Sequence, residues 1–232
     1  MAKSAIVLLP GLDGTGLLFQ RFAQWLPGDC EVRTVVYPTD AHLTLSDYAR
    51  EVTKAWPKGR VVLVAESFSG LVALTLLTET PVRPDAIVFC ATFAEPPRPW
   101  LLRVVGAVPQ AAGLAYRLPD FLLRFCCVGR TADATLADAV RAALRQVPVD
   151  VLAHRLRLVG ARHSFFAEPS TIPCVYLQAS GDRLVPAGAA AWFAKHFASF
   201  RLERIAGPHF LLQAEPQRCA DVVNGLLREV VR

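Results

Sequence analysis

Short apolar runs separated by segments with helical spacing constrain the fold of this chain most strongly. The runs are strand candidates, and they lie at residues 5–9, 32–37, 60–65, 85–91, 174–179 and 200–205. Most are apolar nearly throughout, which is typical of strands that are covered on both faces. Helical patterns lie between them. The alternation predicts an α/β fold, a mostly parallel sheet of about six strands with helices on both faces.

Local signals mark the ends of several expected helices. The segment 45–56 follows Thr44, and Asp47 stands three residues after this threonine, which is a capping-box pattern. Phe19, Phe22, Trp25 and Leu26 recur on one face of a helix expected over 17–26, and Pro216 stands in the first turn of the last helix.

The alternation stops between residues 96 and 165, where no strand-like run occurs. Prolines separate four amphipathic pieces at 100–108, 121–128, 134–147 and 149–159. We interpret this segment as a helical insertion that lies over the sheet. The core would then consist of residues 1–95 and 166–232, with a helical cap of residues 96–165 inserted after the fourth strand.

The stretch VVLVAESFSGLVALTLLTET, residues 61–80, ends a strand at a serine and starts a helix at once. Small residues stand two before and two after Ser67, at Ala65 and Ser69, and Gly70 follows. Small residues could simply allow close packing of a strand on a helix. They could also permit a tight turn that exposes Ser67 as a nucleophile above the sheet, at the positive end of the helix.

Two further residues follow the ends of later strands. Asp182 comes after the strand expected at 174–179, and His209 comes after the one at 200–205. Asp182 could merely cap the next helix, and His209 could be a hydrogen-bonded core histidine. However, the carboxyl ends of parallel strands meet at one edge of a sheet, where ligands bind. The order Ser67, Asp182, His209 therefore predicts a nucleophile, an orienting acid and a general base.

The first strand leads into a glycine-rich loop, LLPGLDGTG, at residues 8–16. Its glycines do not fit the spacing of a dinucleotide-binding loop, and no Gly-Lys-Ser/Thr follows. With Ser67 as nucleophile, the backbone N–H groups of Leu12 and Phe68 would form an oxyanion hole.

The chain resembles α/β-hydrolases over essentially its whole length, through PGLDGTG (10–16), AESFSG (65–70), SGDRLVP (180–186) and GPHF (207–210). It is similar to small bacterial esterases, and the first two motifs also resemble plant phytyl-ester synthase-like acyltransferases. The resemblance implies a reaction through Ser67, His209 and Asp182 with no cofactor and no metal.

Three positions depart from the common pattern of that family. Ala65 and Ser69 replace the motif glycines, and Pro10 stands where many members have histidine. Glu95, just after the fourth strand, is an alternative acid, because some hydrolases draw the acid from there.

The insertion suggests what the chain acts on. Its apolar side chains either pack the cap onto the sheet or line an entrance for an apolar acyl chain; they include Trp100, Leu101, Phe121, Leu122 and Phe125. Residues 96–165 also hold ten arginines and four aspartates but no lysine or glutamate, a balance of +6 in a chain of net charge +5.

The arginines of the insertion form either a solvated helix face or a docking patch for an acidic partner. The candidates for such a patch are Arg141, Arg145, Arg155 and Arg157. An acidic acyl carrier protein is the partner that we expect, because such an arrangement resembles the cap of pimeloyl-carrier-protein methyl ester esterases. No motif favours nucleic acid.

Composition indicates a cytoplasmic protein without stable membrane insertion. The mean hydropathy is +0.34, but no apolar run reaches the roughly 18 residues that cross a bilayer. The N-terminal apolar run ends at Pro10 and is not typical of a signal peptide. Six cysteines lack metal-type spacing, and Cys90 and Cys174 fall inside apolar runs as reduced core residues would.

The sequence therefore predicts a serine carboxylic-ester hydrolase that acts through an acyl-enzyme on a small-molecule ester with an apolar acyl part. Two alternatives remain at this point. An acyltransferase would use the same three residues and pass the acyl group to an acceptor other than water. A ligand-binding protein would keep the scaffold without the chemistry.

Overall fold

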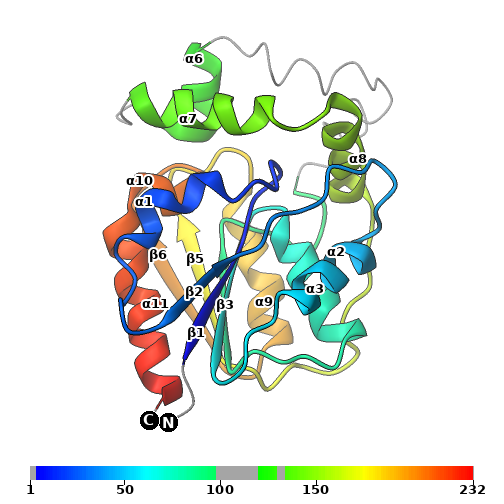
Figure 1. The fold of residues 1–232 in the computed structure, drawn as a ribbon, viewed down its shortest axis with the longest axis vertical. Helices are drawn as coiled ribbons and strands as arrows, with labels where there is room; N and C mark the ends of the chain where they lie inside the picture. The colour runs from blue at the N-terminus through cyan, green and yellow to red at the C-terminus, as the bar shows by residue number, and fades with distance from the viewer. Residues whose placement is uncertain (1–3, 98–119, 130–133, 232) are drawn as a thin grey trace.

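The computed structural model describes residues 4–97, 120–129 and 134–231 (Figure 1). Six strands form one sheet in the order β2-β1-β3-β4-β5-β6, and all five neighbouring pairs are parallel. The strands are β1 Ala5–Leu9, β2 Glu31–Thr34, β3 Val61–Glu66, β4 Ala86–Cys90, β5 Cys174–Ala179 and β6 Phe200–Ile205. The predicted parallel α/β sheet is confirmed.

Three of the expected strands match residue for residue, and β2 differs most from its prediction. The sequence predicts a strand over 32–37, but β2 ends at Thr34. Val35 N–H still donates to the carbonyl of Leu8 at 3.0 Å, whereas Tyr37 N–H donates to Gly14 in the loop after β1 at 2.8 Å. The apolar run therefore continues past the strand because Val35 and Tyr37 are buried against that loop.

Helices cover both faces of the sheet, as Figure 1 shows. One face packs against α2 Leu45–Lys54, α3 Ser69–Glu79 and α9 Ala190–His196, with η4 Ala187–Ala189 leading into α9. The other face packs against α1 Gln20–Ala23 and α11 Pro216–Val231. The 3-10 turn η1 Leu17–Phe19 precedes α1, and the short α10 Leu211–Ala214 precedes α11.

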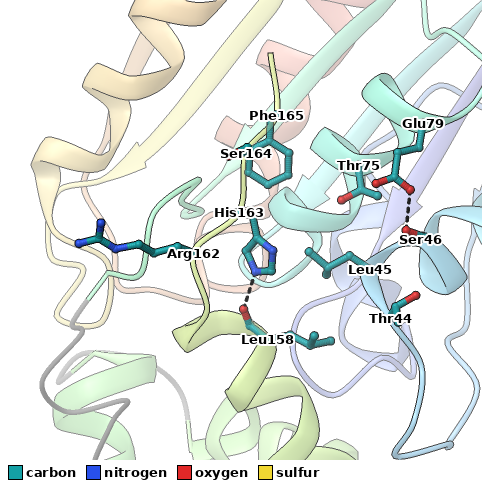
Figure 2. Close-up of a pocket in the computed structure, with 10 residues that line it drawn as sticks. All are labelled: Thr44, Leu45, Ser46, Thr75, Glu79, Leu158, Arg162, His163, Ser164 and Phe165. Carbon is teal, nitrogen blue, oxygen red and sulfur yellow. Dashed lines mark hydrogen bonds between the residues drawn. The ribbon is translucent and has the colours of Figure 1, made fainter. Parts of the chain in front are cut away.

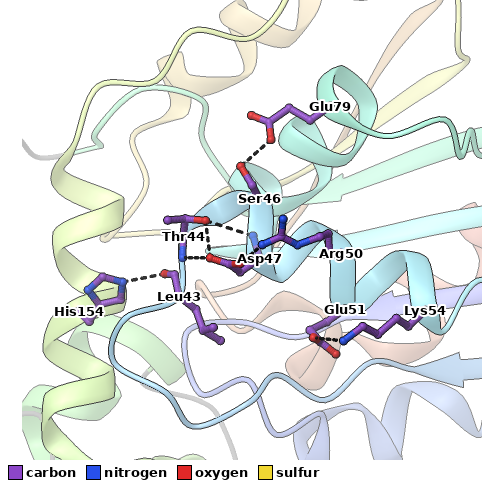
Figure 3. A network of polar contacts seen from close by, with 9 residues as sticks. All are labelled: Leu43, Thr44, Ser46, Asp47, Arg50, Glu51, Lys54, Glu79 and His154. Carbon is purple, nitrogen blue, oxygen red and sulfur yellow. Dashed lines mark hydrogen bonds and ion pairs between the residues drawn. The ribbon is translucent and has the colours of Figure 1, made fainter.

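The predicted capping box starts α2 (Figure 3). Asp47 N–H donates to Thr44 Oγ1 at 3.2 Å, and Thr44 N–H donates to Asp47 Oδ2 at 2.8 Å. The hydrogen bonds from Thr44 lower the pKa of Asp47 to about 2. Ser46 in the same turn donates to Glu79 at the end of α3 and so joins the first turn of α2 to α3.

The described part of the segment between β4 and β5 contains helices but no strand of the sheet. It contains α6 Asp120–Leu123, the π-helix η3 Arg124–Val128, α7 Ala134–Arg145 and α8 Val149–Gly160. These helices lie beyond the end of the sheet toward which the strands run (Figure 1). The piece expected at 100–108 lies outside the described residues, and the boundaries 96 and 165 remain predictions.

Within the described ranges, no helix combines the length and the apolar composition that crossing a bilayer requires.

Candidate active site

Ser67 stands at a strained turn between β3 and α3. Its φ angle is 50°, in the left-handed region that non-glycine residues rarely adopt. Ser67 N–H donates to the carbonyl of Cys90 at 3.0 Å, and the Thr92 hydroxyl donates to the carbonyl of Ser67. Residues at the end of β4 thus hold the turn in a conformation that the chain alone would avoid, as is common at functional sites.

Gly70 is required by the close approach of Thr92. A Cβ added at position 70 would lie 1.8 Å from Thr92 Oγ1, far inside van der Waals contact. The hydroxyl that steadies Ser67 therefore occupies the space that a side chain at position 70 would need.

Ser69, which departs from the motif glycine, makes two buried hydrogen bonds. Its hydroxyl donates to the carbonyl of Pro10, another position that departs from the family pattern, and lies 2.6 Å from the Tyr37 hydroxyl. Burial raises the pKa of Tyr37 well above its usual value, so its phenol stays protonated and can donate to Ser69. The serine thus links the start of α3 to the loop after β1.

The structure brings Ser67, His209 and Asp182 into one hydrogen-bonded chain. Ser67 Oγ lies 2.9 Å from His209 Nε2, and His209 Nδ1 lies 2.8 Å from Asp182 Oδ2. The side chains of His209 and Asp182 are 6% and 5% exposed. Because the carboxylate accepts at Nδ1, that nitrogen carries the proton and Nε2 is left to accept the proton of the serine.

The second oxygen of Asp182 fixes its orientation. Asp182 Oδ1 accepts the backbone N–H groups of Leu184 and Val185 at 2.8 and 2.9 Å. Asp182 therefore holds the turn of residues 182–185 with one oxygen and His209 with the other. It does not cap the next helix, because the N-cap of η4 is Pro186 and makes no side-chain capping hydrogen bond. The alternative acid Glu95 is exposed, and Asp182 occupies the place on His209 that such an acid would take.

The two backbone N–H groups expected to hold an oxyanion are those of Leu12 and Phe68. Neither donates to any acceptor among the described residues. Phe68 is fully buried, and a buried N–H without a partner is rare in proteins. Two such donors, one following the nucleophile and one in the loop beside it, are the arrangement that a developing oxyanion requires.

Glu66 is a buried acid beside Ser67, and no local pattern in the sequence marks it. It is 2% exposed, and Gln213 Nε2 donates to its Oε2 at 3.2 Å. Burial raises the pKa of Glu66 to about 7. The other oxygen of Glu66 and the amide oxygen of Gln213 are buried acceptors without a donor in the described part of the chain. A proton on Glu66 would supply a donor, because two bare acceptors cannot bond each other.

The four arginines expected to form a docking patch do not share one surface. Arg145 and Arg157 are exposed and Arg141 is half-buried. Arg155, by contrast, is fully buried, and the prediction that it docks an external partner is wrong. The signal was present in the sequence, because Val151, Arg155 and Val159 recur every four residues and so share the buried face of α8.

The side chains expected to line an acyl pocket are placed only in part. Trp100 and Leu101 lie outside the described residues, as does the side chain of Leu122. Phe121 and Phe125 are 71% and 50% exposed. Near Leu12, apolar contact from the insertion comes from Val147, between α7 and α8, and from Val151 and Leu152 of α8.

A cavity of about 360 Å³ lies elsewhere, between α2, α3 and the segment after α8 (Figure 2). Its wall includes Leu45, Glu79, Arg162 and Phe165, and it contains none of the residues around Ser67. The described residues also hold no group of three or more His, Cys, Asp or Glu side chains that could bind a metal ion.

Comparison with known proteins gives one family. The model of the alpha/beta hydrolase family matches residues 6–222. No curated protein matches the sequence. Among solved structures, the chain is similar to the esterase EaEST from Exiguobacterium antarcticum, with 14% identity, a TM-score of 0.78, and coverage of 98% of this chain and 93% of that one.

Two further solved structures resemble the chain along nearly its whole length. The type II thioesterase BorB from the borrelidin biosynthetic cluster is 20% identical with a TM-score of 0.69, covering 99% of this chain and 93% of that one. An extracellular alpha/beta-hydrolase from a Paenibacillus species is 22% identical with a TM-score of 0.71, covering 94% and 97%. At these identities the likeness concerns the fold.

Proposed function

The chain belongs to the alpha/beta hydrolase family, and from this premise we propose that it is a serine carboxylic-ester hydrolase working through an acyl-enzyme. The observation that carries the proposal is the hydrogen-bonded chain Ser67–His209–Asp182 beside the N–H groups of Leu12 and Phe68, which have no acceptor in the described part of the chain. A serine hydroxyl is a weak nucleophile until a base takes its proton, and His209 lies in position to do so.

In the acylation step, Ser67 Oγ attacks the ester carbonyl carbon while its proton passes to His209 Nε2. The carbonyl oxygen becomes an oxyanion, which the N–H groups of Leu12 and Phe68 stabilise. Asp182 stabilises the imidazolium through the hydrogen bond at Nδ1 and remains ionised. The tetrahedral intermediate then collapses, the ester C–O bond breaks, and His209 returns the proton to the leaving alcohol.

In the second step, His209 takes a proton from water, and the resulting hydroxide attacks the acyl-serine carbonyl. The same two N–H groups hold the second oxyanion. Collapse breaks the bond to Ser67 Oγ, His209 gives the serine its proton back, and the carboxylic acid is released. No redox step occurs, so the site needs no cofactor for this reaction.

For the substrate we propose an ester with an apolar acyl part, held under the helical cap. Support comes from the apolar cluster of Val147, Val151 and Leu152, against which Leu12 packs. We also propose that an acidic acyl carrier presents the acyl group, because Arg145 in α7 and Arg157 in α8 are exposed cations that could bind its acidic surface. The solved relative BorB is described as a thioesterase, so thioesters belong in the substrate panel.

The proposal is tested with p-nitrophenyl esters from acetate to palmitate, using the wild type, Ser67→Ala and the matched control Ser164→Ala. Ser164 is exposed and lines the cavity of Figure 2, so its loss should leave turnover unchanged. We expect Ser67→Ala to lose turnover by about 10⁴-fold or more. If the wild type is no faster than Ser67→Ala on every ester and thioester, ester hydrolysis is not the function.

A further inference from the structure

Arg155 is the largest fully buried side chain of the described structure, and it lies beneath the loop after β1. Its guanidinium makes four hydrogen bonds. Nη1 donates to the carbonyls of Leu12 and Asp13 at 2.9 and 2.8 Å, Nη2 donates to the carbonyl of Pro38 at 3.1 Å, and Nε donates to the Tyr48 hydroxyl at 3.1 Å. All four acceptors are uncharged.

A buried cation with uncharged acceptors is expensive to desolvate, and apolar side chains of similar size often stabilise a fold at least as well. The faces of Tyr48 and Tyr37 offset part of that cost, with the guanidinium carbon 5.5 and 5.8 Å from the two ring centroids. Packing alone would not require a charged side chain at this position. The carbonyl groups that Arg155 binds therefore indicate its role.

Two of the carbonyls that Arg155 binds, those of Leu12 and Asp13, follow the N–H group of Leu12 directly along the chain. Ser69 holds the carbonyl of Pro10 on one side of this group, and Arg155 holds the carbonyls of Leu12 and Asp13 on the other. The peptide that carries the Leu12 N–H therefore lies between two side-chain anchors. Its direction relative to Ser67 is set from both sides.

Gly14 makes room for the guanidinium in the same loop. Its φ angle is 70°, and a Cβ added there would lie 2.5 Å from Arg155 Nη1. The glycine of PGLDGTG thus allows the loop to fold over an arginine that comes from α8, more than a hundred residues later in the chain.

We propose that Arg155 is a positioning residue that fixes the Leu12 N–H as an oxyanion donor and thereby couples the cap helix α8 to the reaction. The inference rests on the proposed function. Arg155 touches neither the nucleophile nor the reacting carbonyl, so it acts through the loop. Its loss tilts or frees the Leu12 peptide, which weakens binding of the oxyanion more than binding of the ester.

The chain offers a matched control one residue away. His154 also joins α8 to a backbone carbonyl, that of Leu43 before α2, at 2.7 Å (Figure 3), but it does not bond the loop of Leu12. A residue that merely attaches α8 to the core would behave like His154. A residue that sets the oxyanion donor would not.

The experiment compares Arg155→Met, Arg155→Lys and His154→Leu with the wild type on the best p-nitrophenyl ester. We expect Arg155→Met to lower kcat and kcat/KM together by about 10- to 100-fold with KM little changed. An alkyl trifluoromethyl ketone, which forms a tetrahedral adduct with the serine, should bind more weakly by a similar factor. His154→Leu should leave both quantities near wild type.

Urea unfolding establishes that each variant is folded, and Arg155→Lys serves if Arg155→Met does not fold. Lysine keeps the charge but lacks the fork that reaches several carbonyls, so it should shift both quantities in the same direction. Wild-type kcat and ketone affinity in a folded Arg155 variant would overturn the proposal. An equal loss in His154→Leu would also overturn it, because attachment of α8 would then explain the effect.

A wild type no faster than Ser67→Ala would instead reject the proposed function. In that case amide hydrogen exchange over residues 10–14 decides on Arg155 alone. Faster exchange in the Arg155 variants than in His154→Leu would support the role of Arg155 in holding this loop. Equal exchange in all of the variants would refute that role.

Discussion

Replacement of Glu66 by glutamine should change how the stability of the protein depends on pH. Glu66 is 2% exposed, and burial raises its pKa from a usual value of 4.5 to about 7. Between these two values the folded protein binds a proton that the unfolded chain has released. Stability is therefore highest when Glu66 is protonated, and it falls as the pH rises from about 4.5 to about 7.

The size of the effect follows from the pKa difference. A difference of about 2.5 units corresponds to a loss of up to about 3 kcal/mol in the free energy of unfolding across this window. Glutamine does not titrate. Its carbonyl can still accept from Gln213 Nε2.

Urea unfolding of the wild type and Glu66→Gln at pH 4.5, 6 and 8 measures this contribution. Other groups titrate in the same window, but they are common to both proteins and cancel in the difference. We expect the variant to gain on the wild type by up to about 3 kcal/mol between pH 4.5 and pH 8. A difference between the two proteins that does not vary with pH would refute the argument that Glu66 carries a proton in the fold.

Two other changes test the site directly. Asp182→Asn should lower kcat on the p-nitrophenyl esters by about 10⁴-fold while the protein remains folded, because the amide favours the wrong tautomer of His209. A loss of less than tenfold would contradict the role of Asp182 as the orienting acid. Gly70→Ala should destabilise the fold by about 1–3 kcal/mol, because the new methyl group would meet Thr92 Oγ1 at 1.8 Å. Unfolding in urea measures that loss, and wild-type stability would mean that Thr92 does not hold the Ser67 turn as described.

The meeting of the three candidate catalytic residues could be predicted because it depends on local sequence patterns and on chain order. Apolar runs of five or six residues locate strands, and parallel strands end at one edge, so Ser67, Asp182 and His209 could be expected to meet from chain order alone. The capping box of Thr44 and Asp47 is equally local, since it needs residues three apart. These features require no knowledge of how distant segments pack.

The roles of Glu66, Ser69 and Arg155 could not be predicted from the sequence because they depend on distant partners. The local pattern marks Ser69 only as a small residue at a turn, but its hydroxyl donates to the carbonyl of Pro10. Glu66 accepts from Gln213, which lies near the other end of the chain. Helical spacing could place Arg155 on a buried face, yet no pattern in the sequence states which carbonyls its guanidinium reaches.

The sequence by itself determined the parallel α/β sheet and the convergence of a serine, a histidine and an aspartate at its carboxyl edge. Periodicity and chain order are properties of neighbouring residues, and these two outcomes follow from them. Tertiary structure alone decided that an arginine of the insertion would lie under the loop of Leu12 rather than on the surface. Burial of a charge depends on acceptors assembled from Leu12, Asp13, Pro38 and Tyr48, and only the folded chain brings them together.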